Sequence, residues 1–541
     1  MRPHGRLLGA VMLFSIGCLP APGTPRTAAA SGPHPYGETN EPASATATLG
    51  TWAPLPTAPW RIGRPSSKDH PNSRADAPTI LLQNARILLG NGGELARGHV
   101  LLEKGRIASI GEGPGDPPKG AEVIDANGKT ITPGFVDTHS HMGVYPMPSA
   151  HAHEDGNELS APLSAGARTV DAIWPFDPAF ERAVAGGTTT VQVLPGSANL
   201  IGGRATTIKL HPASTGAELV FPGAPYGLKM ACGENPKRVH GREKKGAPAT
   251  RMGNLTLQRG AFLKARRHIE QWDAWRATES ERRASFDRKV ADLAKKQGGL
   301  ADARAACGNH PSERCLARAE DKHPTPVLEP FEPRLPPERD LDSETLAGAL
   351  EGSLLVHVHC YRSDDMGSML ALSDEVGFKV ASFHHALEAY KIRDELTRRG
   401  IAVSTWADWF GFKLEAYDGI PENLALVHAA GGSAVVHTDS SEGVRRLNQE
   451  ASKGMWSGRN AGIQITEAEA IRWVTENPAK ALGVDRWVGT LEVGKDADVV
   501  VWGGNPFSVY GRAELVFVDG ILRHDLKNPP KRSWSDFEVK P

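Results

Sequence analysis

Hydrophobic and polar residues alternate in short runs at both ends of the chain. Residues 79–130 contain three such runs, separated by turn sequences such as Ala126-Asn127-Gly128. Short alternating runs with Gly- and Asn-containing turns are typical of β-strands in a meander. The same pattern returns in residues 489–525. We therefore expect one small β-sandwich domain assembled from the N- and C-terminal segments, over residues 76–132 and 485–525.

The middle of the chain alternates apolar runs of strand length with helical patterns. The apolar runs include residues 188–194, 227–231, 354–359, 379–383, 402–405, 424–428 and 434–437. Helical stretches separate several of them, and this order produces parallel βαβ units. Repeated often enough, such units close into a (β/α)8 TIM-like barrel. We expect the barrel to span residues 133–484, and the fold class is α/β.

Two further segments differ from this alternation. Residues 250–345 begin with a long helical pattern rich in Arg, Lys, Glu and Ala and end in a Pro-rich return to the barrel. They predict a helical insertion with a solvated, charged surface. Residues 31–75 are rich in Pro, Ala, Ser and Thr and have no helical or strand periodicity. Such composition is typical of a disordered tether.

The N-terminus has the features of an export signal. A basic segment precedes an uncharged apolar run over residues 7–18, which is too short to span a bilayer. Two processing routes are open: cleavage after three alanines at residues 28–30, or lipidation of Cys18 as in a bacterial lipobox. We expect a signal peptide over residues 1–30, or a lipoprotein signal to about Cys18. The protein would then lie in the bacterial periplasm or at the cell surface, attached to the membrane only through a lipidated Cys18.

Composition narrows the classes of partner. The chain has 541 residues, with 62 Lys and Arg against 63 Asp and Glu, so its formal net charge is −1. Nucleic-acid binders carry a marked basic excess, which is absent here. The hydrophobic share of 40% allows a large core. We therefore expect an enzyme with a small-molecule substrate and no nucleic-acid partner, and homo-oligomer formation stays open.

Four of the five cysteines lie in the predicted catalytic part of the chain. Cys307 and Cys315 stand in one loop-like stretch, and an oxidising compartment would let them pair. Cys232 and Cys360 lie beside the motifs described next. We expect both of these to be small buried thiols near the active site, with no catalytic role.

The strongest chemical signal is the run Asp137-Thr138-His139-Ser140-His141. On a strand, His139 and His141 point to the same side, because side chains alternate with period two. Two imidazoles on one face can hold a divalent metal ion. Further polar residues follow at the ends of later apolar runs, and barrel active sites lie at the C-terminal strand ends. These residues are Lys229, His357, His359, His384, His385 and Asp439.

Lys229 is unusual because it stands inside an apolar run, where burying an ammonium group is costly. Carboxylation by CO₂ would convert it into a carbamate able to bridge two metal ions. Two alternatives remain. Lys229 could extend from the strand end to solvent, or it could contact the substrate while Glu234 bridges the metals.

Taken together, these motifs resemble the amidohydrolase superfamily, in particular its imidazolonepropionase-like and prolidase-like metal-dependent hydrolases. The resemblance covers residues 79–525 and rests on PGFVDTHSH, GLKMACGENPKR, LLVHVHCYRSDDM, FHHALEAYK, HTDSS and GTLEVGKDADVVVW. It implies that one or two divalent ions, with Zn²⁺ the first choice, are bound by His139, His141, Lys229, His357, His385 and Asp439. His359 would replace His357 if the strand register slips. His384, which has the opposite parity to His385, should face away.

The N-terminal signal and this site together predict an exported, metal-dependent amidohydrolase that hydrolyses a C–N bond in a non-peptide amide or cyclic amide. Asp439 would accept a proton from metal-activated water and pass it to the leaving nitrogen, while His385 stabilises the oxyanion. The candidates for substrate binding are Asn199, Arg204, His359 and Arg362. Two other functions remain as alternatives: an Xaa-Pro or isopeptide-type dipeptidase, and a catalytically inactive surface lipoprotein that binds metal or ligand.

Overall fold

The computed structural model describes residues 52–61, 76–324 and 326–529. The predicted export signal, Cys18 and most of the predicted tether lie outside the described residues. Within them, every helix is too short or too polar to cross a bilayer. The described residues from Pro54 onward belong to one compact unit, in which two sheets of eight strands each form the scaffold.

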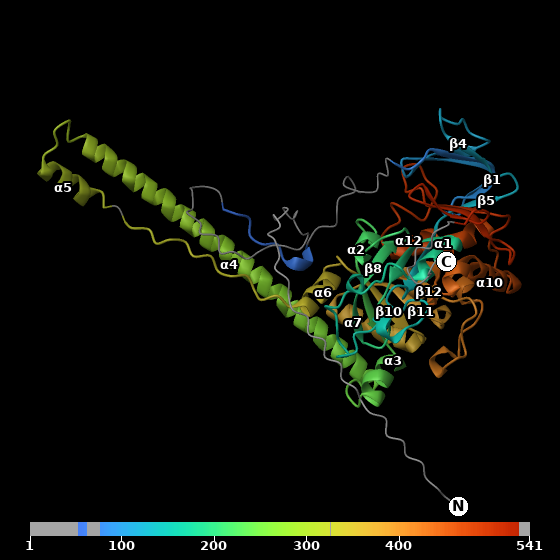
Figure 1. Cartoon of the computed structure of the whole chain (residues 1–541). Helices are drawn as coiled ribbons and strands as arrows, with labels where there is room; N and C mark the ends of the chain where they lie inside the picture. Colours follow the sequence, from blue (N-terminus) through green and yellow to red (C-terminus); the bar gives the residue numbers. More distant parts are fainter. Residues whose placement is uncertain (1–51, 62–75, 325, 530–541) are drawn as a thin grey trace, which may run out of the picture. The chain divides into compact units, whose positions relative to one another are not determined.

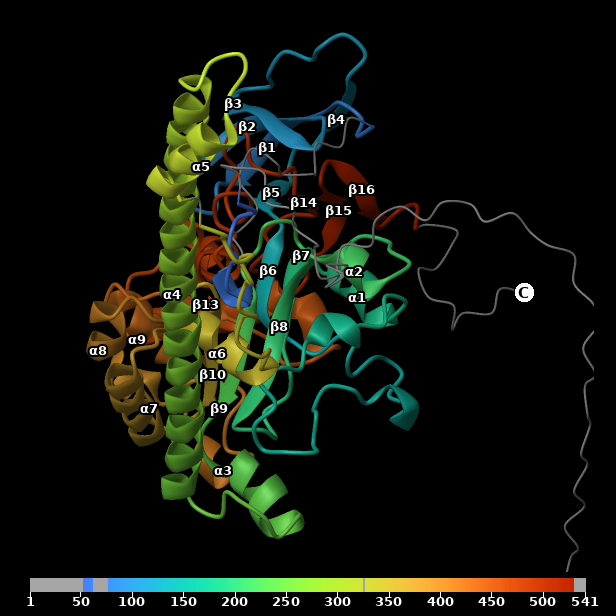
Figure 2. The ribbon, with the colours of Figure 1, turned by 90° about the vertical axis from the view of Figure 1, so that its left-hand side faces the viewer.

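The larger part of the chain folds around a barrel-shaped sheet, whose strands follow one another in chain order from β6 to β13. Figure 2 shows several of them side by side. The strands are β6 (Phe135–Ser140), β7 (Thr188–Val193), β8 (Ile201–Lys209), β9 (Gly227–Ala231), β10 (Leu355–Cys360), β11 (Val380–His385), β12 (Ala402–Thr405) and β13 (Ala434–Val436). The backbone N–H of Asp439 donates to His139 O at 3.1 Å, which brings the two ends of the sheet together. The predicted TIM-like barrel is confirmed.

One strand departs from the regular βα repeat. β8 is antiparallel to both of its neighbours, β7 and β9, whereas the other adjacent pairs are parallel. The short segment 194–200 joins β7 to β8, so no crossover helix fits between them. The register of β8 on β9 then decides which side chains of β8 face the barrel lumen.

Helices cover the outside of the barrel strands, with α7, α8 and α9 packed on β11, β12 and β13. The helices of this layer are α1 (Pro178–Ala185), α7 (Ser363–Val376), α8 (Arg393–Arg398), α9 (Asn423–Ala429), α10 (Leu447–Asn460), α11 (Glu467–Ala470) and α12 (Glu476–Ala481). Two short helices, α2 (Gly216–Leu219) and α3 (Glu234–Pro236), lie in loops. Residues 424–428, expected to be a strand, belong to α9. A short apolar run of Leu, Ala and Val does not distinguish a buried strand from a buried helix.

The predicted helical insertion consists of α4 (Arg251–Ala305), α5 (Glu313–Lys322) and α6 (Leu341–Leu350). Buried residues of α4 recur at helical spacing from Asn254 to Glu279 and stop there, so the remainder of this helix is solvated. Phe262 anchors the buried half by stacking on Phe378 with ring centroids 4.6 Å apart. In Figure 1, α5 lies beside the C-terminal part of α4. The Cys307–Cys315 disulfide closes the turn between them.

The second sheet combines both ends of the chain, as expected. Its strand order is β16-β15-β14-β5-β1-β2-β3, with β4 paired to β1. The N-terminal strands are β1 (Ile80–Leu88), β2 (Glu94–Glu103), β3 (Arg106–Glu112), β4 (Glu122–Asp125) and β5 (Thr130–Pro133), and the C-terminal ones are β14 (Val499–Trp502), β15 (Ala513–Val518) and β16 (Ile521–Asp525). The two sets meet where β14 pairs with β5. Ile87, Val100, Val501 and Phe517 pack in one core drawn from both sets.

A buried ion cluster connects the barrel to this sheet. Lys209, the last residue of β8, is 0% exposed and donates to Asp496 Oδ2 at 2.5 Å and Asp498 Oδ1 at 3.3 Å. It also contacts the carboxylate of Asp519. Burial alone would lower the pKa of Lys209, but the three carboxylates raise it above its usual range. The lysine is therefore charged, and its pairing lets the carboxylates be buried.

Candidate active site

The first donor group lies where β6 ends and the eighth barrel strand, β13, is followed by Asp439. His139 Nε2 and His141 Nε2 are 3.3 Å apart. Asp439 Oδ1 lies 3.1 Å from His141 Nε2 and 3.4 Å from His139 Nε2. Two imidazoles and one carboxylate at this spacing can hold a single divalent ion. The structure thus brings together three of the predicted ligands.

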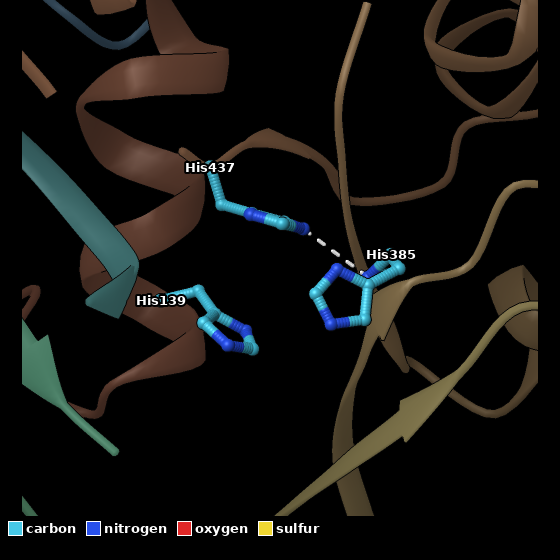
Figure 3. Close-up of side chains that lie close together, drawn as sticks. All are labelled: His139, His385 and His437. Atoms are coloured by element: carbon cyan, nitrogen blue, oxygen red, sulfur yellow. Dashed lines mark hydrogen bonds between the residues drawn. The ribbon is translucent and has the colours of Figure 1, made fainter. Parts of the chain in front are cut away.

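A second donor group shares His139 and adds His385 and His437, all buried (Figure 3). The backbone N–H of His385 donates to His437 Nε2 at 3.2 Å. The Nδ1 atoms of both rings are buried and have no hydrogen-bond partner. Buried polar atoms are normally paired, so these nitrogens fit a metal ion as their missing partner. His437 was not among the predicted ligands, although His437-Thr438-Asp439 repeats the spacing of His139-Ser140-His141.

Left-handed backbone conformations aim two of these side chains. His385, the last residue of β11, has a φ of 68°, and Asp439, three residues after β13, has a φ of 53°. Non-glycine residues rarely adopt this region, and such residues gather at functional sites. The conformation ends the strict alternation of the strand, so that both side chains lie at the barrel mouth.

His384 faces into the barrel, and the expectation that it faces away is wrong. Its Nδ1 lies 2.9 Å from His139 Nδ1, and its Nε2 lies 3.0 Å from His357 Nδ1. In the register of β10 and β11, His384 stands beside His359, and Ser382 beside His357. His384 therefore belongs to the inward-facing row of β11, and His385 reaches the site only because its backbone leaves that row.

His357 lies behind the donor groups rather than among them. Its Nδ1 contacts His384, and its Nε2 lies 3.3 Å from Gln192 Nε2, so both ring nitrogens already have partners. We call the contacts His139–His384–His357–Gln192 the histidine relay. His359, two residues further toward the mouth, has its ring centroid 4.4 Å from that of His385 and a buried, unpaired Nδ1. The geometry favours the register alternative, His359, as the fifth-strand ligand.

Lys229 lies in the lumen on β9, in register with His357. Its side chain is 1% exposed, and Nζ donates to Pro195 O at 2.9 Å. Burial lowers the pKa of Lys229 to about 7, against an opposing effect of Asp439. A substantial fraction of the amine is then neutral near pH 7, and the ammonium does not reach solvent.

The two carboxylates of the site, Asp137 and Asp439, differ in their contacts and in their pKa shifts. Asp137 is fully buried and accepts hydrogen bonds from Thr438 Oγ1 at 2.6 Å and from the backbone N–H of His139 at 3.0 Å. Burial raises its pKa to about 7. Burial also acts to raise the pKa of Asp439, but the hydrogen bond with His141 and the electrostatic effects of His141, His437 and Lys229 hold it below its usual value. Asp439 is therefore ionised near neutral pH, as a proton acceptor must be.

Three of the predicted substrate-binding residues have structural partners instead. Asn199 is buried, donates to Ser164 Oγ at 2.8 Å and lies 2.7 Å from His240 Nε2 through Oδ1. Arg204 donates to Thr345 Oγ1 at 2.8 Å. In the sheet Arg204 pairs with Leu228, which is adjacent to Lys229 in β9. Because Lys229 faces inward, Leu228 and Arg204 face outward, and Arg204 points toward α6. Arg362 forms a two-point ion pair with Asp364 at 2.8 and 2.9 Å. None of the three is brought to the donor groups.

The expectation that the two cysteines near the site are separate thiols is wrong. Cys232 and Cys360 form a disulfide with their Cα atoms 5.3 Å apart. Cys232 follows β9 and Cys360 ends β10, and the backbone N–H of Cys232 donates to His359 O at 2.9 Å. The residues are 128 positions apart, and only the pairing of β9 with β10 makes them neighbours.

Comparison with known proteins identifies the family. Residues 130–540 match the family model described as Amidohydrolase family. The chain belongs to the amidohydrolase family. The predicted superfamily resemblance is thereby confirmed.

Individual relatives of this amidohydrolase agree with the family match. It is 32% identical over 464 residues to amidohydrolase tasK of Hapsidospora irregularis, covering 82% of this chain but only 42% of that protein. A dihydroorotase of Anaeromyxobacter dehalogenans is 28% identical over 145 residues, 26% of this chain and 28% of that one. The crystal structure of an amidohydrolase from Thermotoga maritima MSB8 has a TM-score of 0.64 at 31% identity, covering 82% of this chain and 99% of that chain.

Proposed function

We propose that this amidohydrolase hydrolyses a C–N bond of an amide or cyclic amide in a small molecule, using one or two divalent metal ions, Zn²⁺ first. The observation that carries the proposal is the convergence of two donor groups on His139. His141 and Asp439 form one group with that ring, and His385 and His437 form the other. Two such groups sharing a ligand at a barrel mouth fit metal-assisted hydrolysis.

The role of Asp439 follows from its charge and its neighbours. A divalent ion at this position would lower the pKa of water and polarise the bond to be cleaved. Asp439 is ionised and within 3.4 Å of both His139 and His141, so it can accept the proton of the attacking water. The same carboxylic acid then returns this proton to the leaving nitrogen. A binding-only protein would have no use for such a group.

His385 and Lys229 complete the proposed machinery. His385 is buried, and this burial is the main reason that its pKa lies well below the usual value. The neighbouring histidines lower the pKa further, so the ring is neutral. A neutral imidazole can bind a metal ion or stabilise a developing oxyanion. The neutral amine of Lys229 is the form that reacts with CO₂, which supports a carbamate that joins the ligand set.

We also propose that the protein is exported, to the bacterial periplasm or the cell surface. Two disulfides, Cys232–Cys360 and Cys307–Cys315, support this location, because disulfides persist in oxidising compartments. Mass spectrometry of the protein from cell fractions tests it. Recovery in the cytoplasm with an intact N-terminus and four free thiols would contradict export.

Metal analysis and a substrate panel test the catalytic proposal together. We expect bound zinc in the purified protein, and hydrolysis of at least one member of a panel of N-acyl amino acids, dipeptides, lactams and hydantoin-like rings. Asp439→Asn should keep some bound zinc and lose about 100- to 10,000-fold in kcat, the scale of removing a proton-transfer group. An unchanged kcat in a zinc-loaded Asp439→Asn protein would refute the role of Asp439.

A further inference from the structure

A small cavity opens beside the donor groups, and its walls differ in character. It has a volume of about 270 Å³ and is lined by Trp406, Asp408, Trp409, His437, Thr438, Ser440, Gly443, Arg446 and Glu450. His437 connects it to the metal-binding groups. The volume lies just below the roughly 300–1,000 Å³ of pockets for drug-sized ligands. It therefore suits one end of a small molecule, of the size of an amino acid.

One wall of this cavity is aromatic. The Trp406 ring stacks on His385 with centroids 4.4 Å apart and lies 4.9 Å from the ring of His437. Its Nε1 donates to Thr438 O at 2.8 Å, which fixes the ring in place. Trp409 meets Trp406 edge-on at 5.1 Å and is 50% exposed. The exposed indole offers a flat apolar surface to a ligand.

The charges of the cavity leave one unpaired cation. Lys453 contacts Asp408 Oδ2 at 3.0 Å and Glu450 Oε1 at 2.5 Å, so both acids have a partner, and its single positive charge offsets one of their two negative charges. Among the described residues, the guanidinium of Arg446 has no carboxylate or carbonyl partner. An arginine with its donors free is suited to a two-point interaction with a carboxylate.

The other polar side chains of the cavity are already engaged. Thr438 Oγ1 donates to Asp137 Oδ2 at 2.6 Å. Ser440 Oγ accepts from the backbone N–H of Gly443 at 3.0 Å. Arg446 therefore supplies the free charged donor of this cavity, and the ligand group it fits is an anion.

We propose that this cavity binds the amino-acid part of an N-acyl amino acid. The scissile amide would lie at His437 and the donor groups, an aromatic or large apolar side chain against Trp406 and Trp409, and the free carboxylate at Arg446. This inference rests on the proposed function and makes it more specific, because it names the substrate class. It also replaces Arg204 and Arg362, which have other partners, as the carboxylate contact.

The decisive comparison uses N-acetyl-L-phenylalanine and its neutral carboxamide, with acetate release as the readout. In the zinc-loaded wild type we expect kcat/KM to be about tenfold higher for the acid, as for one charged hydrogen-bonded contact near the surface. Arg446→Met should bring the ratio of the two values to about one. Arg445→Met is the matched control, because Arg445 is the neighbouring exposed arginine and does not line this cavity.

A second comparison of substrates tests the aromatic wall of the cavity. Trp409→Ala should reduce the preference for N-acetyl-L-phenylalanine over N-acetyl-L-alanine by several-fold, since it removes a ring contact and leaves the Arg446 guanidinium in place. The acid-to-carboxamide ratio should not change in this variant. A preference for phenylalanine that survives Trp409→Ala would contradict the placement of the side chain.

The outcomes separate this inference from the proposed function. Turnover with equal kcat/KM for acid and carboxamide, or an Arg446→Met ratio equal to wild type, would overturn the cavity assignment and leave the hydrolase proposal standing. If neither compound is turned over, calorimetric binding of N-acetyl-L-phenylalanine decides. Binding that weakens about tenfold in Arg446→Met supports the cavity and counts against hydrolysis. No binding to the wild type overturns the cavity assignment.

Discussion

Replacing His384 by leucine should weaken metal binding, although His384 contributes no ligand atom to either donor group. The side chain is 0% exposed, and its two ring nitrogens contact His139 Nδ1 at 2.9 Å and His357 Nδ1 at 3.0 Å. Groups behind a metal ligand fix the orientation and tautomer of its ring. Their loss typically lowers metal affinity by about 10- to 100-fold. We expect a loss in this range for zinc.

The hydrogen-bond directions along the histidine relay explain why the loss of His384 should weaken zinc binding. A metal ion held by His139 Nε2 would require the proton on Nδ1, which would then donate to His384 Nδ1. His384 Nε2–H would donate in turn to His357 Nδ1, and His357 Nε2–H would point at the amide of Gln192. That amide must then present its oxygen, and Gln192 Oε1 otherwise has no hydrogen-bond partner. The whole relay thus favours the ring form that binds metal.

Stability should fall as well. His384→Leu leaves Nδ1 of His139 and Nδ1 of His357 buried without partners, at about 1–3 kcal/mol each. Together these give roughly 2–6 kcal/mol lower free energy of unfolding. His268→Leu is the control, since it removes another buried histidine, on α4, outside the donor groups. Its stability can fall while its zinc affinity stays at the wild-type value.

Competition with a chromophoric chelator gives the zinc dissociation constant, and urea unfolding gives the stability. Gln192→Leu breaks only the far end of the relay, so its zinc affinity should lie between those of the wild type and His384→Leu. A His384→Leu protein that is folded and binds zinc within twofold of wild type would refute the proposed role of the relay.

Three further predictions concern buried groups. Lys209→Met leaves three buried carboxylates without their lysine and should lower the free energy of unfolding by about 3–5 kcal/mol, measured by urea denaturation; a change under about 1 kcal/mol would show that the cluster is not coupled to folding. Replacing Cys232 and Cys360 by serine should cost about 2–4 kcal/mol, because the bond closes a long loop, and a Tm equal to wild type would contradict the linkage. Carboxylation of Lys229, followed by infrared or ¹³C signals with labelled bicarbonate, should decrease as the pH falls through about 7, because the protonated amine does not react with CO₂. A carbamate signal at constant strength down to pH 5 would contradict this.

Much of the architecture can be predicted from local patterns in the sequence. Period-two runs at both ends predict a composite β-domain, and β5 indeed pairs with β14. The apolar runs and the HxH motif predict a barrel with His139 and His141 on one side of its first strand. Asp439 at the end of the last strand follows from the same reasoning. These features depend on side-chain alternation and on strand order, which a sequence carries directly.

The inner arrangement of the site required the tertiary structure. Alternation along β11 predicts opposite directions for His384 and His385, but a φ of 68° at His385 ends the alternation and brings both rings inward. The choice between His357 and His359 depends on the register with β9 and on the depth of each ring, which no single strand specifies.

The pairing of neighbouring strands decided two further features, the direction of Arg204 and the disulfide beside the site. The register of β8 on β9 pairs Arg204 with outward-facing Leu228, and the contact of β9 with β10 makes a disulfide of two cysteines far apart in the sequence. The sequence by itself determined the family, the scaffold and the chemical type of the site. Tertiary packing decided which of several chemically equivalent histidines bind and which support, because that distinction depends on a few ångströms of depth in the barrel.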